Sequence, residues 1–507
     1  MSGAGPSGQP TPPWTRAWRG DALAAAAGAV LPFAFSPFFL WPLAPLSLAA
    51  LLVAWCGGST RRAVWRGWLF GLAAFGAGVS WIVSSFQFSN IALPIALVLT
   101  VGFVAFLALY PALVGYASAR LAVALPLPVR LLAVLPALWI VGEWLRGWLL
   151  TGFTWLQLGY SQVDGPLAGW LPVGGVYGAG LAVAVVAGGL AWTVLAPGPR
   201  PAGALAAVLL AASLVAQVGN RDWTQPAGPP LEVALVQGNV PQDQKWRPEM
   251  RAPTLERYMQ LTAPHLGADL LVWPETAVPG QEAMMQPFIQ ELGRVAARAG
   301  SSVLFGIPEY SGTPFRAYNT VLMVGAHGGR YRKRHLVPFG EYLPLDTVLR
   351  PITRALGIPV SNFSPGAAVQ PPLQVAGHRV AMFVCYEIAF GNEVAAALPA
   401  ATLLATVSND AWFGDSIGPH QHLQMARARA LETGRELVRA TNTGITALVD
   451  ARGRVGARLE QFSAASLHGQ VTPRAGATPY VRWGDLPALV LCALLLAPCL
   501  AARRRGR

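Results

Sequence analysis

Cys385 is the residue of this chain whose type and position most directly suggest chemistry. It ends the apolar run 380–384, and Tyr386 and Glu387 follow it directly. The remaining cysteines lie in or beside long apolar runs elsewhere in the chain: Cys56, Cys492 and Cys499. Cys385 therefore has no disulfide partner in its own region. A thiol that ends an apolar strand is placed like a nucleophile, and the ordinary alternative is a small buried hydrophobic side chain.

Two further segments place an ionisable side chain just after a predicted strand. Glu275 follows an apolar run and a proline, and Lys333 stands in a segment that continues to Glu341. A carboxylate such as Glu275 can take the proton of the Cys385 thiol and later return it to the leaving group. A cation such as Lys333 lowers the pKa of a neighbouring thiol and stabilises an oxyanion, with help from a backbone N–H near Tyr386. Glu341 could orient Lys333 or tune the base.

Each of these residues also has a structural interpretation. Glu275 could cap a helix, and Lys333 could belong to a solvated basic face, since arginines flank it. His335 offers an alternative partner for the thiol as a Cys–His pair. His420 and His422 have no cysteine or carboxylate nearby at ligand spacing, so we predict no metal site. The soluble region also lacks a phosphate-binding glycine motif at a strand-to-helix turn, and we predict no cofactor.

The region 220–483 is predicted to be a soluble α/β domain. Apolar, β-rich runs alternate there with helical patterns such as 279–299 and 420–433. This alternation indicates a sheet layered with helices. The predicted strands are Leu231–Val236, Asp269–Trp273, Ser302–Gly306, Asn319–Val324, Val380–Val384, Leu403–Val407 and Ile445–Val449.

The composition of the whole chain is that of a membrane protein. Of its 507 residues 53% are hydrophobic and only 12% are charged, whereas soluble domains carry roughly 25% charged residues. The net charge of +13 does not predict nucleic-acid binding, because the excess of basic residues lies in short segments between apolar runs. Basic segments of that kind set the orientation of a membrane protein.

The apolar runs predict about eight membrane helices, seven within 21–219 and the eighth within 484–507. A span requires about 20 residues, and each run is close to that length or longer. The runs are 21–36, 39–56, 66–86, 91–117, 128–149, 166–195, 202–219 and 484–502. Prolines at 32, 37, 42 and 45 interrupt the first two runs, which could form two short spans or one re-entrant hairpin, and a secretory signal is a further alternative for the first run. Arginines between the runs and at both ends place the tail 1–20 and the C-terminus in the cytoplasm. The region 220–483 then lies outside, in the periplasm of a Gram-negative cell.

Glu143 and Arg146 interrupt the fifth predicted span. Their spacing of three puts both on one helix face, where they can neutralise each other. Ionisable residues inside a membrane indicate function, and a structural ion pair near the outer interface is the alternative. We keep both residues as candidates for substrate binding.

The catalytic candidates, taken together, resemble those of the carbon–nitrogen hydrolase (nitrilase) superfamily, which uses Glu, Lys and Cys in this order. Longer motifs, and the Gly142–Gly147 segment in the fifth span, make nearly the whole chain resemble the apolipoprotein N-acyltransferase family. The soluble motifs are Leu235–Gln242, Trp273–Thr276, Lys333–Tyr342, Cys385–Glu387 and Ser408–Gly414. No departure from the family pattern occurs at the three catalytic positions.

The resemblance implies a fold and a reaction. The fold is an α-β-β-α sandwich on a bundle of about eight membrane helices in the bacterial inner membrane. The reaction is a ping-pong transfer in which Cys385 takes an acyl chain from a phospholipid, phosphatidylethanolamine being the expected donor. The thioester then passes that chain to the free amine of a diacylglyceryl-cysteine apolipoprotein. A thioester survives to meet a second substrate only if water is kept out. We expect a monomer.

Apolar residues near the catalytic segments are predicted to receive the lipid chains. The candidates are Trp246, Met284, Met285, Trp412 and Phe413, and core packing is the alternative for each. Two rival functions are a membrane-anchored amidase, which would not need eight spans, and a membrane scaffold or transporter. The scaffold would leave three reactive residues in ordered motifs unexplained.

Overall fold

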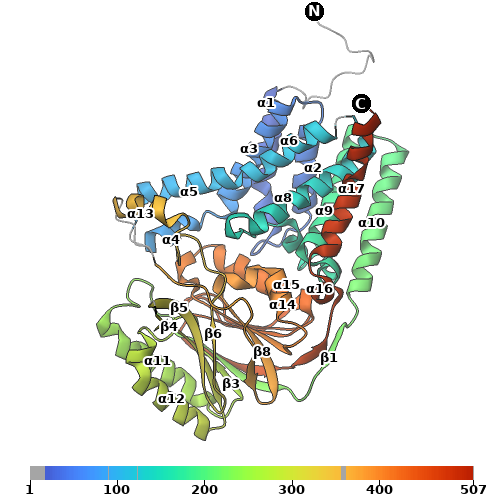
Figure 1. Cartoon of the computed structure of the whole chain (residues 1–507). Coiled ribbons are helices and arrows are strands. Elements are labelled where there is room, and N and C mark those ends of the chain that lie inside the picture. Colours follow the sequence, from blue (N-terminus) through green and yellow to red (C-terminus); the bar gives the residue numbers. More distant parts are fainter. Residues whose placement is uncertain (1–16, 89–90, 123, 314, 356–360, 506–507) are drawn as a thin grey trace, which may run out of the picture.

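The chain folds into a helical part and a part built of layered sheets (Figure 1). The structure, a computed structural model, describes residues 17–88, 91–122, 124–313, 315–355 and 361–505. Of the expected tail 1–20, residues 1–16 lie outside the described residues. The first helix begins at Ala17, and the last ends at Arg505.

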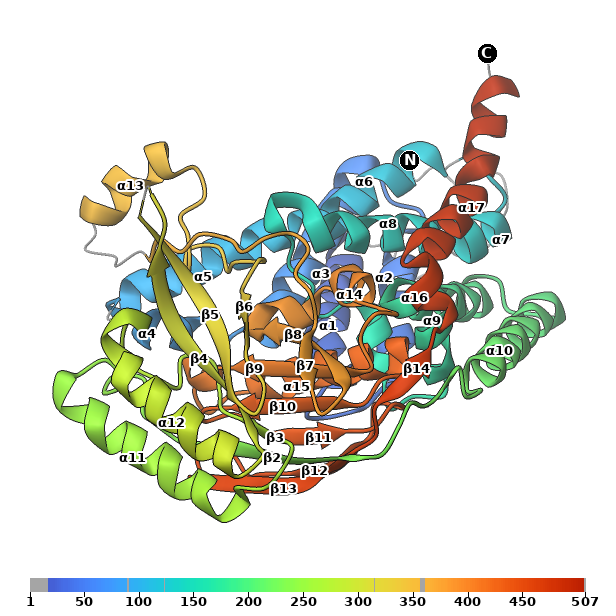
Figure 2. The ribbon, with the colours of Figure 1, turned by 60° about the horizontal axis from the view of Figure 1, so that its bottom comes forward.

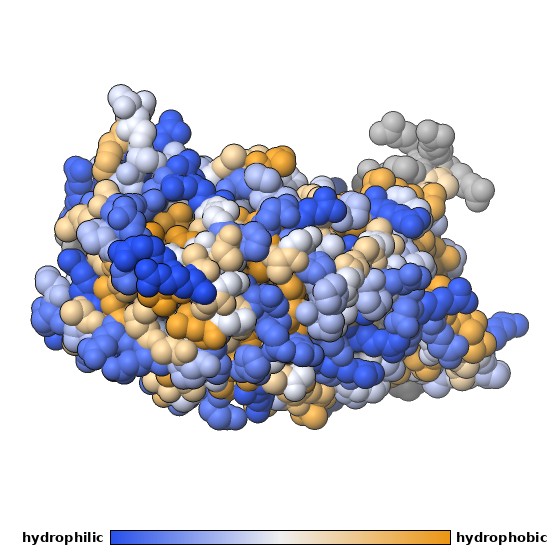
Figure 3. All heavy atoms as spheres, turned by 90° about the horizontal axis from the view of Figure 1, so that it is seen from below, coloured by the Kyte–Doolittle hydropathy of each residue, from blue (hydrophilic) through white to orange (hydrophobic). Residues whose placement is uncertain are grey.

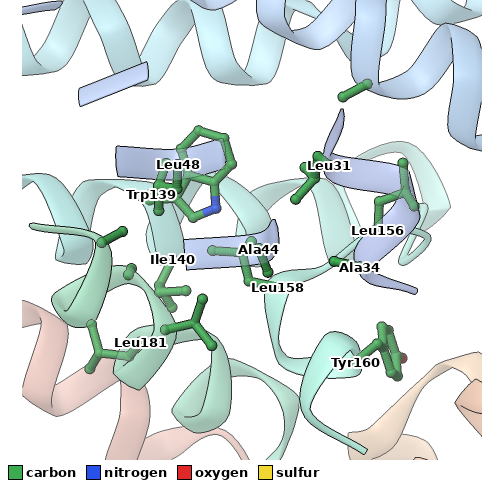
Figure 4. Close-up of a cluster of buried hydrophobic side chains, with 14 of the residues drawn as sticks. Leu31, Ala34, Ala44, Leu48, Trp139, Ile140, Leu156, Leu158, Tyr160 and Leu181 are labelled. Atoms are coloured by element: carbon green, nitrogen blue, oxygen red, sulfur yellow. The ribbon is translucent and has the colours of Figure 1, made fainter. Parts of the chain in front are cut away.

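The helical part contains the first ten α-helices and the last one. Their bounds are α1 Ala17–Val30, α2 Leu43–Trp55, α3 Thr60–Gly78, α4 Ile82–Phe88, α5 Leu93–Leu107, α6 Leu109–Leu121, α7 Leu127–Val129, α8 Leu135–Trp148, α9 Leu171–Leu195, α10 Pro199–Gly219 and α17 Leu486–Arg505. Leucine, alanine and aromatic side chains fill the space between them (Figure 4), including Leu48, Trp139, Ile140, Leu158 and Tyr160.

The number of long apolar helices is smaller than the eight spans that we predicted. Among the described residues, four helical segments are long and apolar enough to cross a membrane: Leu93–Leu121, Leu127–Thr151, Ala168–Leu195 and Pro199–Gly219. The pair α3 and α4 makes a fifth if it counts as one span bent by 53°. The helices α1 and α2 have 14 and 13 residues. At 1.5 Å per residue each is only about 20 Å long, shorter than the ~30 Å hydrocarbon core of a bilayer. The proline-rich stretch between them ends α1 and delays the start of α2.

The layered part contains two six-stranded sheets that pack face to face (Figure 2). One sheet has the order β13-β2-β3-β4-β5-β6, and the other has the order β12-β11-β10-β9-β8-β7. The bounds of the first are β2 Leu231–Gln237, β3 Leu270–Val272, β4 Ser302–Ser311, β5 Arg316–Gly325, β6 Gly329–Arg332 and β13 Ala465–Val471. Those of the second are β7 Leu373–Val375, β8 His378–Val384, β9 Leu403–Ser408, β10 Leu437–Thr441, β11 Ala447–Val449 and β12 Val455–Arg458. The short strands β1 Thr224–Pro226 and β14 Arg474–Gly476 pair beside them.

Helices cover the outer face of each sheet, so the layers run α-β-β-α. The covering helices are α11 Arg251–Thr262, α12 Gln286–Arg298, α14 Gly391–Ala396, α15 Gly418–Thr433 and α16 Pro479–Trp483, whereas α13 Asp346–Ala355 stands out from the layers (Figure 2). Alternate residues of each strand face opposite layers, as the two-residue repeat of a strand requires. On β8, Met382 faces the other sheet while Phe383 packs under α14 and α15. Each predicted strand coincides with an observed one, and the sandwich follows from that pattern.

The helix α15 belongs to two cores at once. Leu423, Ala426 and Ala430 pack on the sheet, while Met425 and Leu431 pack into the core of the helical part. Its polar side chains also reach the bundle. The Gln421 amide donates to the Gly78 carbonyl at the bend between α3 and α4, at 3.0 Å. Glu432 accepts the Val176 N–H at 2.9 Å, next to the break in α9. The opposite face of the sandwich is mostly hydrophilic (Figure 3).

Candidate active site

The three predicted catalytic residues each follow a strand. Glu275 comes after β3, Lys333 follows β6 directly, and Cys385 follows β8 directly. Cys385 has a φ of 54°, and Thr276, beside the carboxylate, has a φ of 49°. A non-glycine residue in this region costs on the order of 1–3 kcal/mol and persists only where its surroundings hold it. The chain therefore turns sharply at the thiol and again next to the carboxylate.

Lys333 lies between two carboxylates. Its Nζ is 2.9 Å from Glu341 Oε2 and 3.5 Å from Glu275 Oε1. The Asn319 amide bridges the same two carboxylates, donating to Glu275 Oε1 at 2.7 Å and to Glu341 Oε1 at 2.8 Å. The backbone N–H of Asn409 donates to the other oxygen of Glu275 at 2.8 Å. This network fixes the base and the cation with respect to each other, and Glu341 orients the lysine as one of our two interpretations predicts.

The charges of this network set the protonation of the thiol and the amine. Burial lowers the pKa of Lys333, but the carboxylates of Glu341 and Glu275 outweigh burial and hold that pKa above its ordinary value. Burial and the charge of Glu275 raise the pKa of the Cys385 thiol, against opposing effects of Lys333 and of a hydrogen bond with Ser408. Lys333 lowers the thiol pKa as we expected, but burial and Glu275 outweigh that effect. The resting thiol keeps its proton, and a base must remove it.

Glu387 is a buried anchor that joins the Cys385 and Lys333 segments. Its Oε2 accepts the Val384 N–H at 2.7 Å, and its Oε1 accepts the N–H groups of Arg334 at 2.9 Å and His335 at 3.2 Å. The Tyr331 hydroxyl also donates to it, at 3.0 Å. Burial raises the pKa of Glu387, and the backbone donors oppose that effect. The predicted supporting role of Glu387 is thus one of position, since it ties the end of β8 to the end of β6.

Tyr386 and His335 connect this site to the helical part. The Tyr386 hydroxyl donates to the Gly152 carbonyl at 2.7 Å, and its ring stacks on Trp155 at 5.7 Å between centroids. His335 contacts Glu393 Oε1 through Nδ1 at 2.6 Å and the Thr151 carbonyl through Nε2 at 2.9 Å. Both ring nitrogens of His335 are therefore occupied, and the alternative Cys–His pair has no support in the geometry.

Several residues of the site were missed in the sequence. Lys245 is buried and donates to Thr276 Oγ1 at 2.8 Å and to the Glu275 carbonyl at 3.3 Å. Burial lowers the pKa of Lys245 to about 8, although Glu275 opposes that shift. His422, which we considered from the sequence only as a metal ligand, lies 3.0 Å from Asp410 Oδ1 and 3.1 Å from the Cys385 carbonyl. These contacts join segments that lie far apart in the sequence. The only sequence signal for them was the run of three polar residues at 408–410.

The predicted substrate residues fall into two groups. Trp246 and Met284 are exposed, at 53% and 62%, and Trp412 is partly exposed, as lipid-contacting side chains must be. Met285 packs instead in the core between α12 and its sheet. Phe413 lies edge-on against Trp81, 4.6 Å between centroids, in the core shared with the helical part. For these last two residues, the alternative of core packing is the correct one.

Glu143 and Arg146 contact the loop 151–165 rather than the catalytic groups. Glu143 accepts the Leu158 N–H at 3.0 Å, and Arg146 donates to the carbonyls of Phe153 at 2.8 Å and Trp155 at 2.6 Å. Among the described residues, the two side chains form no ion pair with each other. Their contacts shape the loop whose Trp155 stacks on the residue after the nucleophile. They act on the site through that loop.

A cavity of about 830 Å³ lies between the helical and layered parts. Its walls include Trp148 and Tyr177 of the helical part and His335, Phe390 and Arg429 of the layered part. None of the three catalytic candidates lines it. The described residues contain no group of three or more His, Cys, Asp or Glu side chains that could hold a metal ion. The chemistry that the site can do comes from the thiol, the carboxylates and the ammonium, a set suited to acyl transfer.

Known protein families match both parts of the chain. Residues 27–189 match the apolipoprotein N-acyltransferase N-terminal domain, and residues 232–480 match the carbon–nitrogen hydrolase family. Among solved structures, a CN-hydrolase superfamily protein from Xanthomonas campestris matches with a TM-score of 0.37 and 18% identity, over 52% of this chain and 97% of that one.

Relatives match along almost the full length of the chain. The apolipoprotein N-acyltransferase of Methylococcus capsulatus is 49% identical over 488 residues, which cover 96% of each chain. That of Azotobacter vinelandii is 44% identical, over 97% of this chain and 96% of its own. That of Pseudomonas putida is also 44% identical, over 96% of this chain and 97% of its own. At this identity over almost the full length of both chains, this chain belongs to the apolipoprotein N-acyltransferase family.

Proposed function

We propose that this protein moves an acyl chain from a membrane phospholipid to the N-terminal amine of diacylglyceryl-cysteine apolipoproteins, through a thioester on Cys385. The observation that carries the proposal is the buried cluster in which Lys333 lies 2.9 Å from Glu341 and 3.5 Å from Glu275, and in which the charges of Glu275 and Lys333 act on the thiol. Membership of an N-acyltransferase family supports the identity of the acceptor.

The first half-reaction acylates the enzyme. Glu275 takes the thiol proton as the sulfur of Cys385 attacks the ester carbonyl. Lys333 and the backbone N–H of Tyr386 stabilise the negative charge on the carbonyl oxygen. The ester C–O bond then breaks, and Glu275 returns the proton to the departing alkoxide, which leaves as lysophospholipid. Because the resting thiol is protonated, attack requires a base to remove that proton.

The second half-reaction transfers the chain. The neutral amine of the apolipoprotein attacks the thioester carbonyl, and the same two donors stabilise the oxyanion. Glu275 takes a proton from the amine nitrogen, the C–S bond breaks, and the proton returns to the sulfur of Cys385. The product is an N-acylated lipoprotein and a restored thiol, so no cofactor is consumed.

The arrangement in the membrane is also part of the proposal. We assign 1–20 and the end of α17 to the cytoplasm, 21–219 and 484–507 to the membrane part, and 220–483 to the periplasm. What supports this orientation is that α1 and the C-terminal end of α17 lie at the end of the molecule opposite the sheets (Figure 1). Phosphatidylethanolamine is the proposed donor, the inner membrane is the proposed location, and a single copy of the chain supplies every catalytic group.

Lipid access from the outer leaflet favours this function over that of an anchored amidase. The helix α13 stands out from the sandwich (Figure 2); its Val348 is exposed at 62%, and Leu345, directly before the helix, at 75%. Trp246 and Met284 add exposed apolar surface. An amidase acting on small soluble amides needs no such surface, whereas two lipid-anchored substrates do.

Intact mass spectrometry tests the proposal directly. The purified protein is incubated with phosphatidylethanolamine, beside Cys385→Ala. We expect the wild type to gain the mass of one acyl chain and to lose it when a diacylglyceryl-cysteine peptide is added. The variant should gain none. An adduct that persists in Cys385→Ala, or an adduct that only water removes, would contradict the proposal, and the second result would favour the amidase.

A further inference from the structure

His422 contacts the nucleophile through its backbone. This histidine lies on α15 with no exposed surface, and its Nε2 is 3.1 Å from the carbonyl oxygen of Cys385. A carbonyl oxygen can only accept a hydrogen bond, so Nε2 must carry the proton. On the other side of the ring, Nδ1 lies 3.0 Å from Asp410 Oδ1. The rings of Trp155 and Phe413 pack around it.

The buried carboxylate of Asp410 fixes His422 from the Nδ1 side of the ring, away from Cys385. Asp410 accepts from Arg439 Nη2 at 2.6 Å and from the Ser408 hydroxyl at 2.5 Å. Burial alone would raise the pKa of Asp410, but Arg439 and His422 hold it below its ordinary value. The same guanidinium nitrogen is 3.2 Å from His422 Nδ1. The imidazole is therefore fixed in position and orientation, and its Nε2–H points at one acceptor.

The peptide unit that His422 contacts has two tasks in the reaction. It sets the backbone of Cys385, whose φ of 54° needs external support. The same planar unit carries the N–H of Tyr386, and in a trans peptide the C=O and N–H point in opposite directions. Fixing the carbonyl toward His422 therefore fixes the direction of the Tyr386 N–H. A hydrogen bond to the carbonyl also polarises the unit and strengthens its N–H as a donor.

We propose that His422 is a positioning residue that aims the oxyanion-binding N–H of Tyr386 by donating a hydrogen bond to the peptide unit between Cys385 and Tyr386. The inference rests on the proposed function of Cys385. It differs from the alternative Cys–His pair, because His422 contacts the backbone and takes no proton from the sulfur.

Two substitutions distinguish the effect of the Nε2–H donor from the effect of the ring of His422. His422→Phe keeps a ring and removes the donor, and His422→Gln places an amide N–H near the position of Nε2. His420→Phe is the matched control, since His420 lies on the same helix and interacts with Asp415 and Arg458 instead. The readouts are thioester formation from phosphatidylethanolamine, followed by intact mass spectrometry, and alkylation of Cys385 by iodoacetamide. Alkylation needs the thiol but develops no oxyanion.

We expect His422→Phe to slow thioester formation about 100-fold, the usual effect of losing one oxyanion donor. The KM for phospholipid and the alkylation rate should stay within about threefold, and His422→Gln should recover most of the acylation rate. His420→Phe should behave like the wild type. Equal losses of acylation and alkylation in a folded His422→Phe protein would overturn the inference, as would acylation at the wild-type rate.

Two controls keep the test decisive. If His422→Phe does not fold, the shorter polar His422→Asn, which cannot reach the carbonyl, takes its place with the same expectations. If His422→Gln folds and yet acylates no faster than the variant without a donor, the hydrogen bond is not the cause. A wild type that forms no thioester on Cys385 would instead refute the proposed function itself, whatever the variants do.

Discussion

Replacing Glu387 by glutamine tests whether one buried carboxylate holds the thiol segment and the lysine segment together. The carboxylate accepts N–H groups on both oxygens, from Val384 on one and from Arg334 and His335 on the other. An amide has only one oxygen, so in either orientation at least one backbone N–H faces an NH₂ group. The side chain is fully buried, and no water can replace the lost acceptor.

The magnitude follows from counting these hydrogen bonds. A buried donor left unsatisfied costs about 1–3 kcal/mol, and each remaining bond loses about 1 kcal/mol when the acceptor becomes neutral. The neutral amide returns part of this cost, because burial disfavours the charged form of Glu387. We therefore expect a net loss of about 2–3 kcal/mol in the free energy of unfolding. For a domain of this size, that lowers the apparent unfolding temperature by about 5–10 °C.

Activity should fall further than stability suggests. A misplacement of about 1 Å costs on the order of 100-fold in rate, and Glu387 positions both Cys385 and Lys333. The assays are unfolding followed by intrinsic fluorescence in detergent, and thioester formation followed by intact mass. Glu393→Gln is the control, because Glu393 is partly exposed and pairs with Arg334 and His335 at the surface. A Glu387→Gln protein that unfolds and acylates like the wild type would refute this reasoning.

Three further predictions follow from the site. Glu275→Gln should slow thioester formation by about 10²–10⁴, as expected for a lost general base, and an intact-mass time course at the wild-type rate would exclude Glu275 as that base. Tyr386→Phe should lower the unfolding temperature by a few degrees, because it removes only the hydrogen bond to Gly152, and no change would show that this bond does not join the two parts. The folded pKa of Lys245 is about 8, below the ordinary 10.5, so the native state releases this proton first and stability should rise from pH 8 to 10.5. Lys245→Met should remove that rise. The same change in unfolding temperature between pH 8 and 10.5 in the wild type and in Lys245→Met would contradict the pKa shift.

The alternating strands and helices and the three reactive groups could be predicted because each signal is local, whereas the sandwich was implied by the family resemblance. Glu275 and Cys385 follow apolar runs that are readable without a structure, and Lys333 was marked by the motif that continues to Tyr342. The strands of the two six-stranded sheets that were missed are β6, β7, β10, β12 and β13. Each mixes polar with apolar residues, so no continuous apolar run marks it.

The contacts that were missed depend on the register of distant segments. His422 and Lys245 reach the site from a helix and a loop far along the chain, and no spacing in the sequence encodes their distance to Cys385 or Glu275. Met285 and Phe413 show the converse error, because an apolar residue beside a catalytic segment has the same sequence signature in a pocket and in a core. Fewer long apolar helices occur among the described residues than the eight predicted spans, because an apolar run does not show where a bend such as that between α3 and α4 divides it.

The two apolar faces of α15 have a consequence for the independence of the two halves of this chain. One face is covered by the sheet, and the other, with Met425, Ala428 and Leu431, is covered only by the helical part. Tyr386 and Phe390, next to the nucleophile, share that cover. A catalytic half expressed alone would present this surface to water and associate through it. The enzyme is therefore not a soluble hydrolase tethered to an anchor, and its catalytic half cannot be detached and kept in solution.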